Sequence, residues 1–199
     1  MHGPDTRASL IEQLADSNCQ PAWDEFVRLY QPAIYRVACN RGLQHADAED
    51  LTQDVLTQIG CKVKDFDVSG SGSFRGWLGK ITRDMLVDGL RRRQRAVDVA
   101  SGDSGVRGQL AELPSRDETG TLIQIEVRRE QLMSACERIR FQFSEPVWLS
   151  FWLTAIEQQS IAKVAEQLNR SEGSVRVARC RVMNRLKEEV RNNDSSASL

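Results

Sequence analysis

The sequence predicts an all-α protein with two small helical domains joined by a flexible linker, the C-terminal domain being a helix-turn-helix. Apolar residues recur at spacings of three and four along most of the 199 residues, and no segment has the alternating pattern of a strand. The stretch from Leu78 to Arg140 contains no Phe, Trp or Tyr, so we expect no core to be centred there. This length allows one or two domains.

The N-terminal half is predicted to contain long amphipathic helices. Apolar spacing predicts two helices, or one kinked helix, from Pro21 to Arg41, because Pro32 interrupts the pattern. An acidic amphipathic helix is expected from Asp47 to Ile59. Another is expected from Phe74 to Arg95, with Ser73 as its N-terminal cap.

A linker is predicted after these helices. Periodicity fails from Ala96 to Thr121, where Gly and acidic residues gather. The predicted organisation is an N-terminal extension at 1–21, a first domain at 22–95, an acidic linker at 96–131, a second domain at 132–191 and a polar tail at 192–199.

The second domain carries the strongest local signal, a helix-turn-helix. Helices are expected over Ser160–Leu168 and Ser171–Val190, with Asn169 able to adopt the left-handed conformation of the tight turn and Ser171 capping the second helix. The apolar stripe of that second helix is Val175, Ala178, Val182 and Leu186.

The opposite face of the second helix is predicted to meet DNA. Arg176, Val177, Cys180 and Arg181 are expected to point outward, with Arg179 at the edge of the stripe. Such residues near a helix N-terminus meet base edges in the major groove, and flanking arginines meet phosphates. The alternative is an ordinary helical hairpin with a solvated arginine face; we favour DNA binding because turn, cap and basic face coincide.

Charge is segregated along the chain although the net charge is only −1. Residues 1–74 hold 6 basic and 11 acidic groups, whereas residues 75–95 hold 7 basic and 2 acidic groups. Residues 171–199 are also basic on balance, and the predicted linker is acidic. Two basic segments separated by an acidic one indicate two contacts with nucleic acid.

Acidic residues of the helix at 47–59 allow three interpretations. The first is a metal site, which we disfavour because His45 is expected to precede the helix and no second nitrogen ligand is at hand. The others are a solvated acidic face and a docking surface for a basic protein, and we favour docking.

The helix at 74–95 ends in a run of arginines and follows a Gly/Ser loop with Phe66 and Phe74 at its ends. Basic residues at a helix C-terminus often serve only the helix dipole. The alternative is a surface for an unstacked nucleic-acid strand, held by aromatic stacking and phosphate contacts. Trp77 is expected in the core instead, because it shares a face with Ile81 and Met85.

Several protein classes are excluded. No run approaches the roughly 20 apolar residues of a membrane span, and the N-terminus does not resemble a secretory signal, so we expect a cytoplasmic protein. The five cysteines have neither disulfide nor zinc-site spacing, and we expect buried reduced thiols. With both the zinc site and the acidic-helix metal site disfavoured, we expect no metal or cofactor.

Four motifs in order resemble an extracytoplasmic-function sigma factor of RNA polymerase. Three resemble its domain two and the helix-turn-helix resembles its domain four. The three are Trp23-Asp24-Glu25-Phe26-Val27-Arg28-Leu29-Tyr30, Asp47-Ala48-Glu49-Asp50-Leu51-Thr52-Gln53-Asp54-Val55, and Ser73-Phe74-Arg75-Gly76-Trp77-Leu78 with Asp88-Gly89-Leu90-Arg91-Arg92-Arg93.

The resemblance implies a transcription-initiation subunit that has no catalytic chemistry of its own and is not an enzyme. It would bind core RNA polymerase (clamp helices and flap) and promoter DNA, and anti-sigma factors are common partners in such families. The residues implied to bind core polymerase are Asp47, Glu49, Asp50, Gln53 and Asp54. Those implied for the minus-ten element are Phe66, Ser71, Phe74, Arg83, Asp88, Arg91 and Arg92. Those implied for the minus-thirty-five element are Ser171, Ser174, Arg176, Val177, Arg179, Cys180 and Arg181.

Four positions depart from the family pattern, one of them Asn169, which tolerably replaces the usual Gly of the turn. Asp84 stands where Asn is common, and a carboxylate there is unfavourable near phosphates unless a neighbour such as Arg83 compensates. Ala178 and Arg179 shift the basic face of the last helix, so the promoter sequence does not follow from the family. The alternatives left open are a stand-alone helix-turn-helix regulator and, last, a metal-dependent nuclease.

Overall fold

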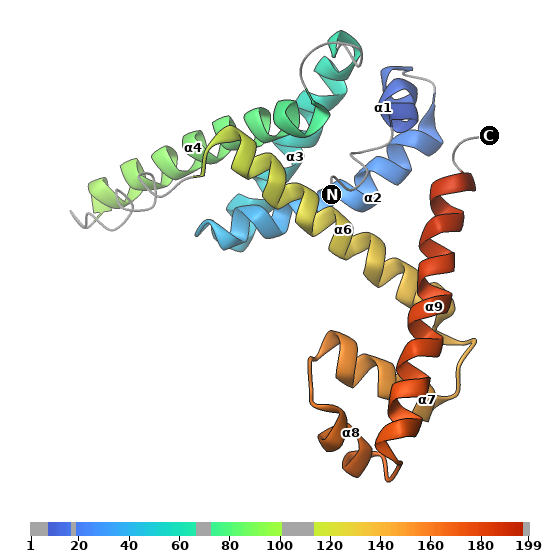
Figure 1. Ribbon diagram of the computed structural model, residues 1–199. Helices are drawn as coiled ribbons and strands as arrows, with labels where there is room; N and C mark the ends of the chain where they lie inside the picture. The colour runs from blue at the N-terminus through green and yellow to red at the C-terminus, as the bar shows by residue number, and fades with distance from the viewer. Residues whose placement is uncertain (1–7, 17–18, 67–72, 101–113, 197–199) are drawn as a thin grey trace. The chain divides into compact units, whose positions relative to one another are not determined.

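The computed structural model describes residues 8–16, 19–66, 73–100 and 114–196, and only the backbone at 8–9, 93–100 and 192–196. In these residues every regular element is a helix, which confirms the predicted all-α class (Figure 1). The chain divides into two compact units, Met1–Glu130 and Gln131–Leu199.

The first unit is built from α1 (Ala8–Ala15), α2 (Gln20–Asn40), α3 (His45–Lys62), a short 3₁₀ turn, α4 (Phe74–Ala100) and the first part of α6 (Arg116–Arg140). Between Pro21 and Arg41 the structure has one helix, with Pro21 in its first turn and Pro32 inside it. Ser73 caps α4 as predicted, because its Oγ accepts the backbone N–H of Gly76 at 3.1 Å.

Aromatic rings from α2 and α4 form the centre of the first core. Phe26 and Tyr30 are buried and stack with ring centroids 4.3 Å apart. Phe74 meets both rings edge-on at 6.1 Å. Leu51, Val55 and other apolar residues of α3 close the core, and these burials leave the opposite, acidic side of α3 in solvent.

The predicted N-terminal extension contributes to this core. Leu10, Ile11 and Leu14 of α1 are all buried, and they pack with the residues of α2 to α4. A boundary at residue 21 is therefore wrong for the folded unit, because removing α1 would take three large aliphatic side chains out of the core and expose the apolar surface that they cover.

The predicted linker at 96–131 is wrong over much of its length. Residues 96–100 continue α4, and residues 116–131 belong to α6. Ile123 and Val127 are 1% and 2% exposed in the first core, so aliphatic residues pack where the absence of aromatic ones suggested no core. Residues 101–113 lie outside the described residues.

Helix α6 begins with a reciprocal cap. The backbone N–H of Ser115 donates to the Glu118 carboxylate at 2.7 Å, and the backbone N–H of Glu118 donates to Ser115 Oγ at 3.2 Å. The bond from the backbone N–H of Ser115, and after it the hydrogen bond of the Ser115 side chain to the carboxylate, hold the pKa of Glu118 below its ordinary value. The Ser-x-x-Glu pattern was visible in the sequence, and it is the signal that the linker prediction missed.

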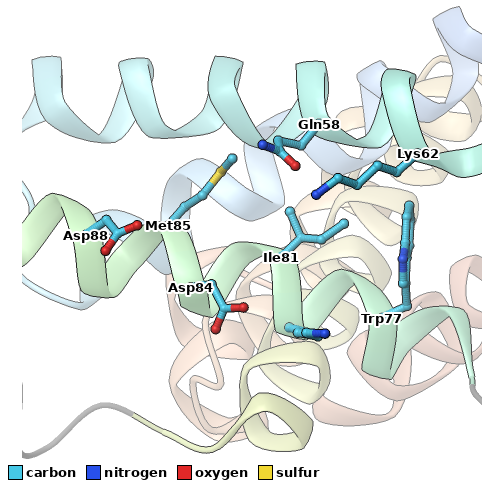
Figure 2. Close-up of a pocket in the computed structure, with 8 residues that line it drawn as sticks. Gln58, Lys62, Trp77, Ile81, Asp84, Met85 and Asp88 are labelled. Atoms are coloured by element: carbon cyan, nitrogen blue, oxygen red, sulfur yellow. The ribbon is translucent and has the colours of Figure 1, made fainter.

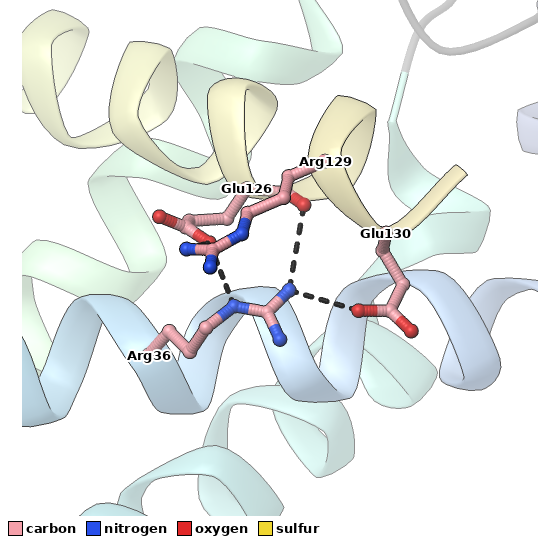
Figure 3. A network of polar contacts seen from close by, with 4 residues as sticks. All are labelled: Arg36, Glu126, Arg129 and Glu130. Atoms are coloured by element: carbon pink, nitrogen blue, oxygen red, sulfur yellow. Dashed lines mark hydrogen bonds and ion pairs between the residues drawn. The ribbon is translucent and has the colours of Figure 1, made fainter. Parts of the chain in front are cut away.

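Arg36 connects α2 to the first part of α6 (Figure 3). Its Nε donates to Glu126 Oε2 at 2.6 Å, and its Nη2 lies 3.0 Å from Glu130 Oε2. The Glu126 side chain is only 15% exposed, so the ion pair is partly shielded from water. Together with Ile123 and Val127, this network attaches α6 to the first unit.

The second unit contains the rest of α6, then α7 (Glu145–Phe151), a π-helical turn (Trp152–Ile156), α8 (Ile161–Gln167) and α9 (Glu172–Ser196). Trp148 and Phe151 of α7 are buried against Val182 and Leu186 of α9. Helix α6 ends at Arg140, and in the tail predicted from residue 192 α9 continues to Ser196.

The cysteines differ in part from the prediction of buried thiols. All five are free, but Cys61 and Cys180 are exposed, since each lies on the side of its helix that faces away from the core. Cys136 is buried, and burial raises the pKa of its thiol. Within the described residues, no helix is both long enough and apolar enough to cross a bilayer.

Candidate nucleic-acid and protein interfaces

The acidic side of α3 is fully exposed. Ala48, Leu51 and Val55 are buried on its inner side, and the 3.6-residue period then turns the polar residues outward. The exposed side chains include all five residues predicted to bind core polymerase: Asp47, Glu49, Asp50, Gln53 and Asp54. The surface presents oxygen atoms to a partner without enclosing them in a pocket.

The metal interpretation of this surface has no geometric support in the part of the chain that is described. There, no group of three His, Cys, Asp or Glu side chains is placed to hold a metal ion. His45 is the first residue of α3 and does not precede it, and its Nδ1 lies 2.7 Å from the Tyr35 hydroxyl. One ring nitrogen is therefore already engaged by a protein group.

A pocket of about 340 Å³ lies between α3 and α4 (Figure 2). Trp77, Ile81 and Met85 supply its apolar surface, and they follow one another along α4 at spacings of four. The charged and polar residues that line it are Gln58, Lys62, Lys80, Asp84 and Asp88.

Sequence reasoning missed this pocket and its two lysines. Trp77 was assigned to the core; it packs against the core but is half-buried and also lines the pocket. The sequence does indicate part of the pocket wall. Residues 77, 81, 84 and 88 are spaced so that they lie along one side of α4, with the two apolar residues first and the two acidic residues after them. Lys62 comes from α3, and only the folded packing of the helices brings it to that side of α4.

The two aromatic residues predicted for the minus-ten element, Phe66 and Phe74, differ in how deeply they are buried. Phe74 is 5% exposed among the rings of α2, so the prediction that it meets a base is at odds with its position in the core. Phe66 is half-buried, with its ring 5.2 Å from that of Trp77. Ser71 lies outside the described residues.

The predicted basic residues of α4 fall into two groups. Arg91 and Arg92 are exposed one turn beyond Asp88, which lines the pocket; Arg91 Nη1 lies 3.9 Å from the Asp88 carboxylate. Arg83 instead donates from its Nε to the carbonyl oxygen of Pro114 at 2.8 Å. Arg83 is therefore engaged with the chain just before α6.

The helix-turn-helix has the predicted turn and caps. Asn169 has a φ of 50°, the left-handed conformation expected of it. Ser171 Oγ accepts the backbone N–H of Ser174 at 3.2 Å and so caps α9, and Ser160 Oγ does the same for Lys163 at the start of α8.

The two sides of α9 also match the prediction. Its inner stripe of Val175, Ala178, Val182 and Leu186 is buried. Arg179 and Ser174 are half-buried at the edge of this stripe. The exposed side contains Ser171 just before the helix and Arg176, Val177, Cys180 and Arg181 within it.

Two of the exposed arginines have contacts within the second unit. Arg176 Nη2 lies 2.9 Å from Glu172 Oε2, and the Arg181 guanidinium lies 5.9 Å from the centre of the Phe143 ring. The Arg176 side chain is 61% exposed despite this pair. A surface ion pair of this kind contributes little stability, and phosphate can replace the carboxylate at small cost.

Comparison with known proteins gives a family match that lies within the first unit. Residues 26–96 match the sigma-70 region 2 family. A stretch of 90 residues is 34% identical to the ECF RNA polymerase sigma factor SigE of Mycolicibacterium smegmatis, and it covers 45% of this chain and 34% of that protein. The chain thus spans about a third of the length of the curated relative that it matches. The family match takes in both the acidic side of α3 and the pocket.

Proposed function

We propose that the chain is an alternative sigma factor of the extracytoplasmic-function type, because residues 26–96 match a sigma-70 region 2 domain. It binds core RNA polymerase, directs it to specific promoters and helps to open the DNA. The observation that carries the proposal is the presence, on one chain, of this domain and a helix-turn-helix with an exposed basic side. Its place of action is the cytoplasm, where the chromosome is transcribed.

The acidic side of α3 is the proposed contact with polymerase. Four carboxylates and Gln53 project from one exposed helical surface, and a basic partner surface would pair with them. In the resembling family this helix docks on the clamp helices of the largest subunits. The second unit is proposed to reach the flap, and an anti-sigma factor remains a proposed partner.

The pocket between α3 and α4 is the proposed contact with the melted minus-ten strand. A volume of about 340 Å³ accommodates a nucleobase. Trp77 offers an aromatic surface, on which stacking contributes about 1–3 kcal/mol per base. Lys62 and Lys80 provide charge for the phosphates, and Arg91 and Arg92 continue this charge along α4.

Helix α9 is the proposed contact with the minus-thirty-five element. Its exposed residues near the N-terminus are positioned as in other recognition helices, and its arginines supply phosphate contacts. Val177 is 69% exposed, which is unusual for a large aliphatic side chain and suits contact with a thymine methyl group.

Run-off transcription tests the proposal. The purified chain is mixed with core RNA polymerase and a library of genomic fragments, with core enzyme alone as the control. We expect discrete transcripts that require the chain. If no fragment gives a promoter-specific transcript while the chain alone binds a duplex tightly and sequence-specifically, the stand-alone regulator is the correct function instead.

A further inference from the structure

The pocket proposed to receive a DNA strand has carboxylates on its wall. Asp84 and Asp88 both line it, together with Lys62 of α3 and Lys80 of α4. A carboxylate about 4 Å from a phosphate is repelled by roughly 1 kcal/mol even in water, which is about a fivefold loss of affinity. A strand-binding pocket therefore requires these carboxylates to be neutralised.

Each of the two carboxylates has an arginine partner that does not line the pocket. Arg116 Nη2 lies 3.5 Å from Asp84 Oδ1, and Arg91 Nη1 lies 3.9 Å from Asp88 Oδ1. In the described part of the chain, neither Lys62 nor Lys80 has an ion-pair partner. The two ammonium groups are therefore left available for an anion.

Arg116 is held at this place by backbone packing, not by its own ion pair. It is the first residue of α6, directly after the capping Ser115. Its carbonyl oxygen lies against Gly79 of α4, where the two helices cross too closely for a β-carbon. The hydrogen bond from Arg83 Nε of α4 to the carbonyl oxygen of Pro114, two residues before Arg116, also attaches this end of α6 to α4.

We propose that Arg116 is a positioning residue of the pocket: it neutralises Asp84, so that the phosphates of a single DNA strand can approach Trp77, Lys62 and Lys80. The inference rests on the proposed function, since it gives a role to Arg116 in the same binding site. It assigns the start of α6 to the strand-binding unit, although the sequence predicted a linker there.

The test measures the affinity of the full chain for DNA. The probe is a fluorescein-labelled single-stranded oligonucleotide of mixed sequence, followed by anisotropy at low salt, where charge contacts are least screened. The variants are Arg116→Ala, Asp84→Asn and the double variant. Arg129→Ala is the matched control, because Arg129 lies on the same helix, is 66% exposed and does not line the pocket. Circular dichroism verifies that each variant is folded.

We expect Arg116→Ala to weaken binding about fivefold, and Arg129→Ala to leave it unchanged. In the Asp84→Asn background the Arg116 substitution should have less than about a twofold effect, because no carboxylate is left to neutralise. A merely structural role of Arg116 would not produce this rescue.

Other results of this experiment would overturn the role of Arg116 without touching the proposed function of the chain. Equal losses from Arg116→Ala in both backgrounds, or no loss in either, overturn the role of Arg116 while the chain still binds DNA. If Arg116→Ala unfolds the first unit, the affinity of Asp84→Asn for the oligonucleotide tests the role of Arg116 by itself. A loss of affinity in Asp84→Asn overturns that role, and unchanged or tighter binding supports it. A wild-type chain that does not bind the oligonucleotide overturns the pocket as a strand-binding site and the role of Arg116 with it, whereas run-off transcription with core polymerase decides the proposed function.

Discussion

Gly79 of α4 and Gly120 of α6 lie at a helix crossing that leaves no room for a β-carbon on either residue. A β-carbon on Gly79 would lie 2.6 Å from the backbone nitrogen of Gly120 and 2.8 Å from its Cα. A β-carbon on Gly120 would overlap the carbonyl oxygen of Arg75. The two backbones are thus in direct contact, which brings the start of α6 close enough to α4 for Arg116 to reach Asp84.

Substitution of Gly120 by Ala should therefore destabilise the first unit. The obstructing atoms are backbone atoms, which cannot rotate away, so α6 must shift as a whole. We expect a loss of about 1–3 kcal/mol in the free energy of unfolding, the usual range for overpacking. Urea unfolding followed by circular dichroism measures it.

Gly60→Ala in α3 is the matched control, because the nearest atom to its added β-carbon would be a ring carbon of Trp23 at an ordinary 3.7 Å. Alanine is the better helix former by about 0.5–1 kcal/mol, so this variant should be as stable as wild type or more so. Equal stability of the two variants would contradict the close crossing.

Arg36→Ala should also destabilise the first unit. The substitution leaves the Glu126 carboxylate, 15% exposed, without its partner at 2.6 Å, and it removes the contact with Glu130. We expect a loss of about 1–2 kcal/mol in the free energy of unfolding. Arg129→Ala is the control. The Arg129 side chain is 66% exposed and its Nη1 lies 3.9 Å from Glu126 Oε2, so this substitution should cost no more than about 0.5 kcal/mol.

The helix-turn-helix was predictable because its signals are local. A left-handed turn residue, a serine cap and an apolar stripe all lie within the 27 residues from Ser160 to Leu186, and the structure places Asn169, Ser171 and Val175 as expected. Local propensity and tertiary packing agree there, so the sequence pattern alone indicates the structure.

The start of α6 and the pocket were missed for two different reasons. The capping pattern of Ser115 and Glu118 is local and can be read in the sequence. The Gly-rich and acidic composition of residues 96–121 is typical of a linker, however, and it hides the start of the helix. The pocket is not local, because Lys62 and Trp77 meet only when α3 packs on α4. Likewise, the pairing of Asp84 with Arg116 joins residues from two helices.

The acidic side of α3 can be tested by its charge. Asp50→Ala combined with Asp54→Ala should weaken binding to core polymerase, because both side chains are exposed on the proposed contact surface. Losing two rim charges should lower the affinity about tenfold, and less at high salt. The matched control removes two exposed carboxylates elsewhere in the first unit, Glu12→Ala with Asp24→Ala. A pull-down with core polymerase in which both double variants behave alike would contradict this surface as the contact.

The arginines of α9 can be tested by salt dependence. If Arg176, Arg179 and Arg181 each neutralise one phosphate, replacing all three by Ala should flatten the log–log salt slope of duplex DNA binding by about 2.7. Lys187→Ala, further along α9 and exposed, is the control and should change the slope by less than about 1. The slopes of wild type, the triple variant and the control are obtained from anisotropy measurements of DNA binding at about 50 to 200 mM salt. An unchanged slope in the triple variant would remove α9 as the DNA contact.

The stability of the second unit should depend on acid through Glu189. Arg138 Nε lies 2.9 Å and Arg185 Nη2 3.1 Å from its carboxylate oxygens, and these contacts, the one with Arg138 first, hold the pKa of Glu189 below its ordinary 4.5. A lowered pKa in the folded state means that the ionised carboxylate stabilises the fold above about pH 4.5, and that this contribution is lost as pH falls through the lowered value.

Glu189→Gln should therefore melt at a lower temperature than wild type at neutral pH, and the difference should shrink toward zero under acid conditions. Thermal unfolding at several pH values measures this, with the exposed neighbour substitution Glu188→Gln as the control. A melting-temperature difference for Glu189→Gln that stays constant with pH would show that the two arginines do not act through the charge of this carboxylate.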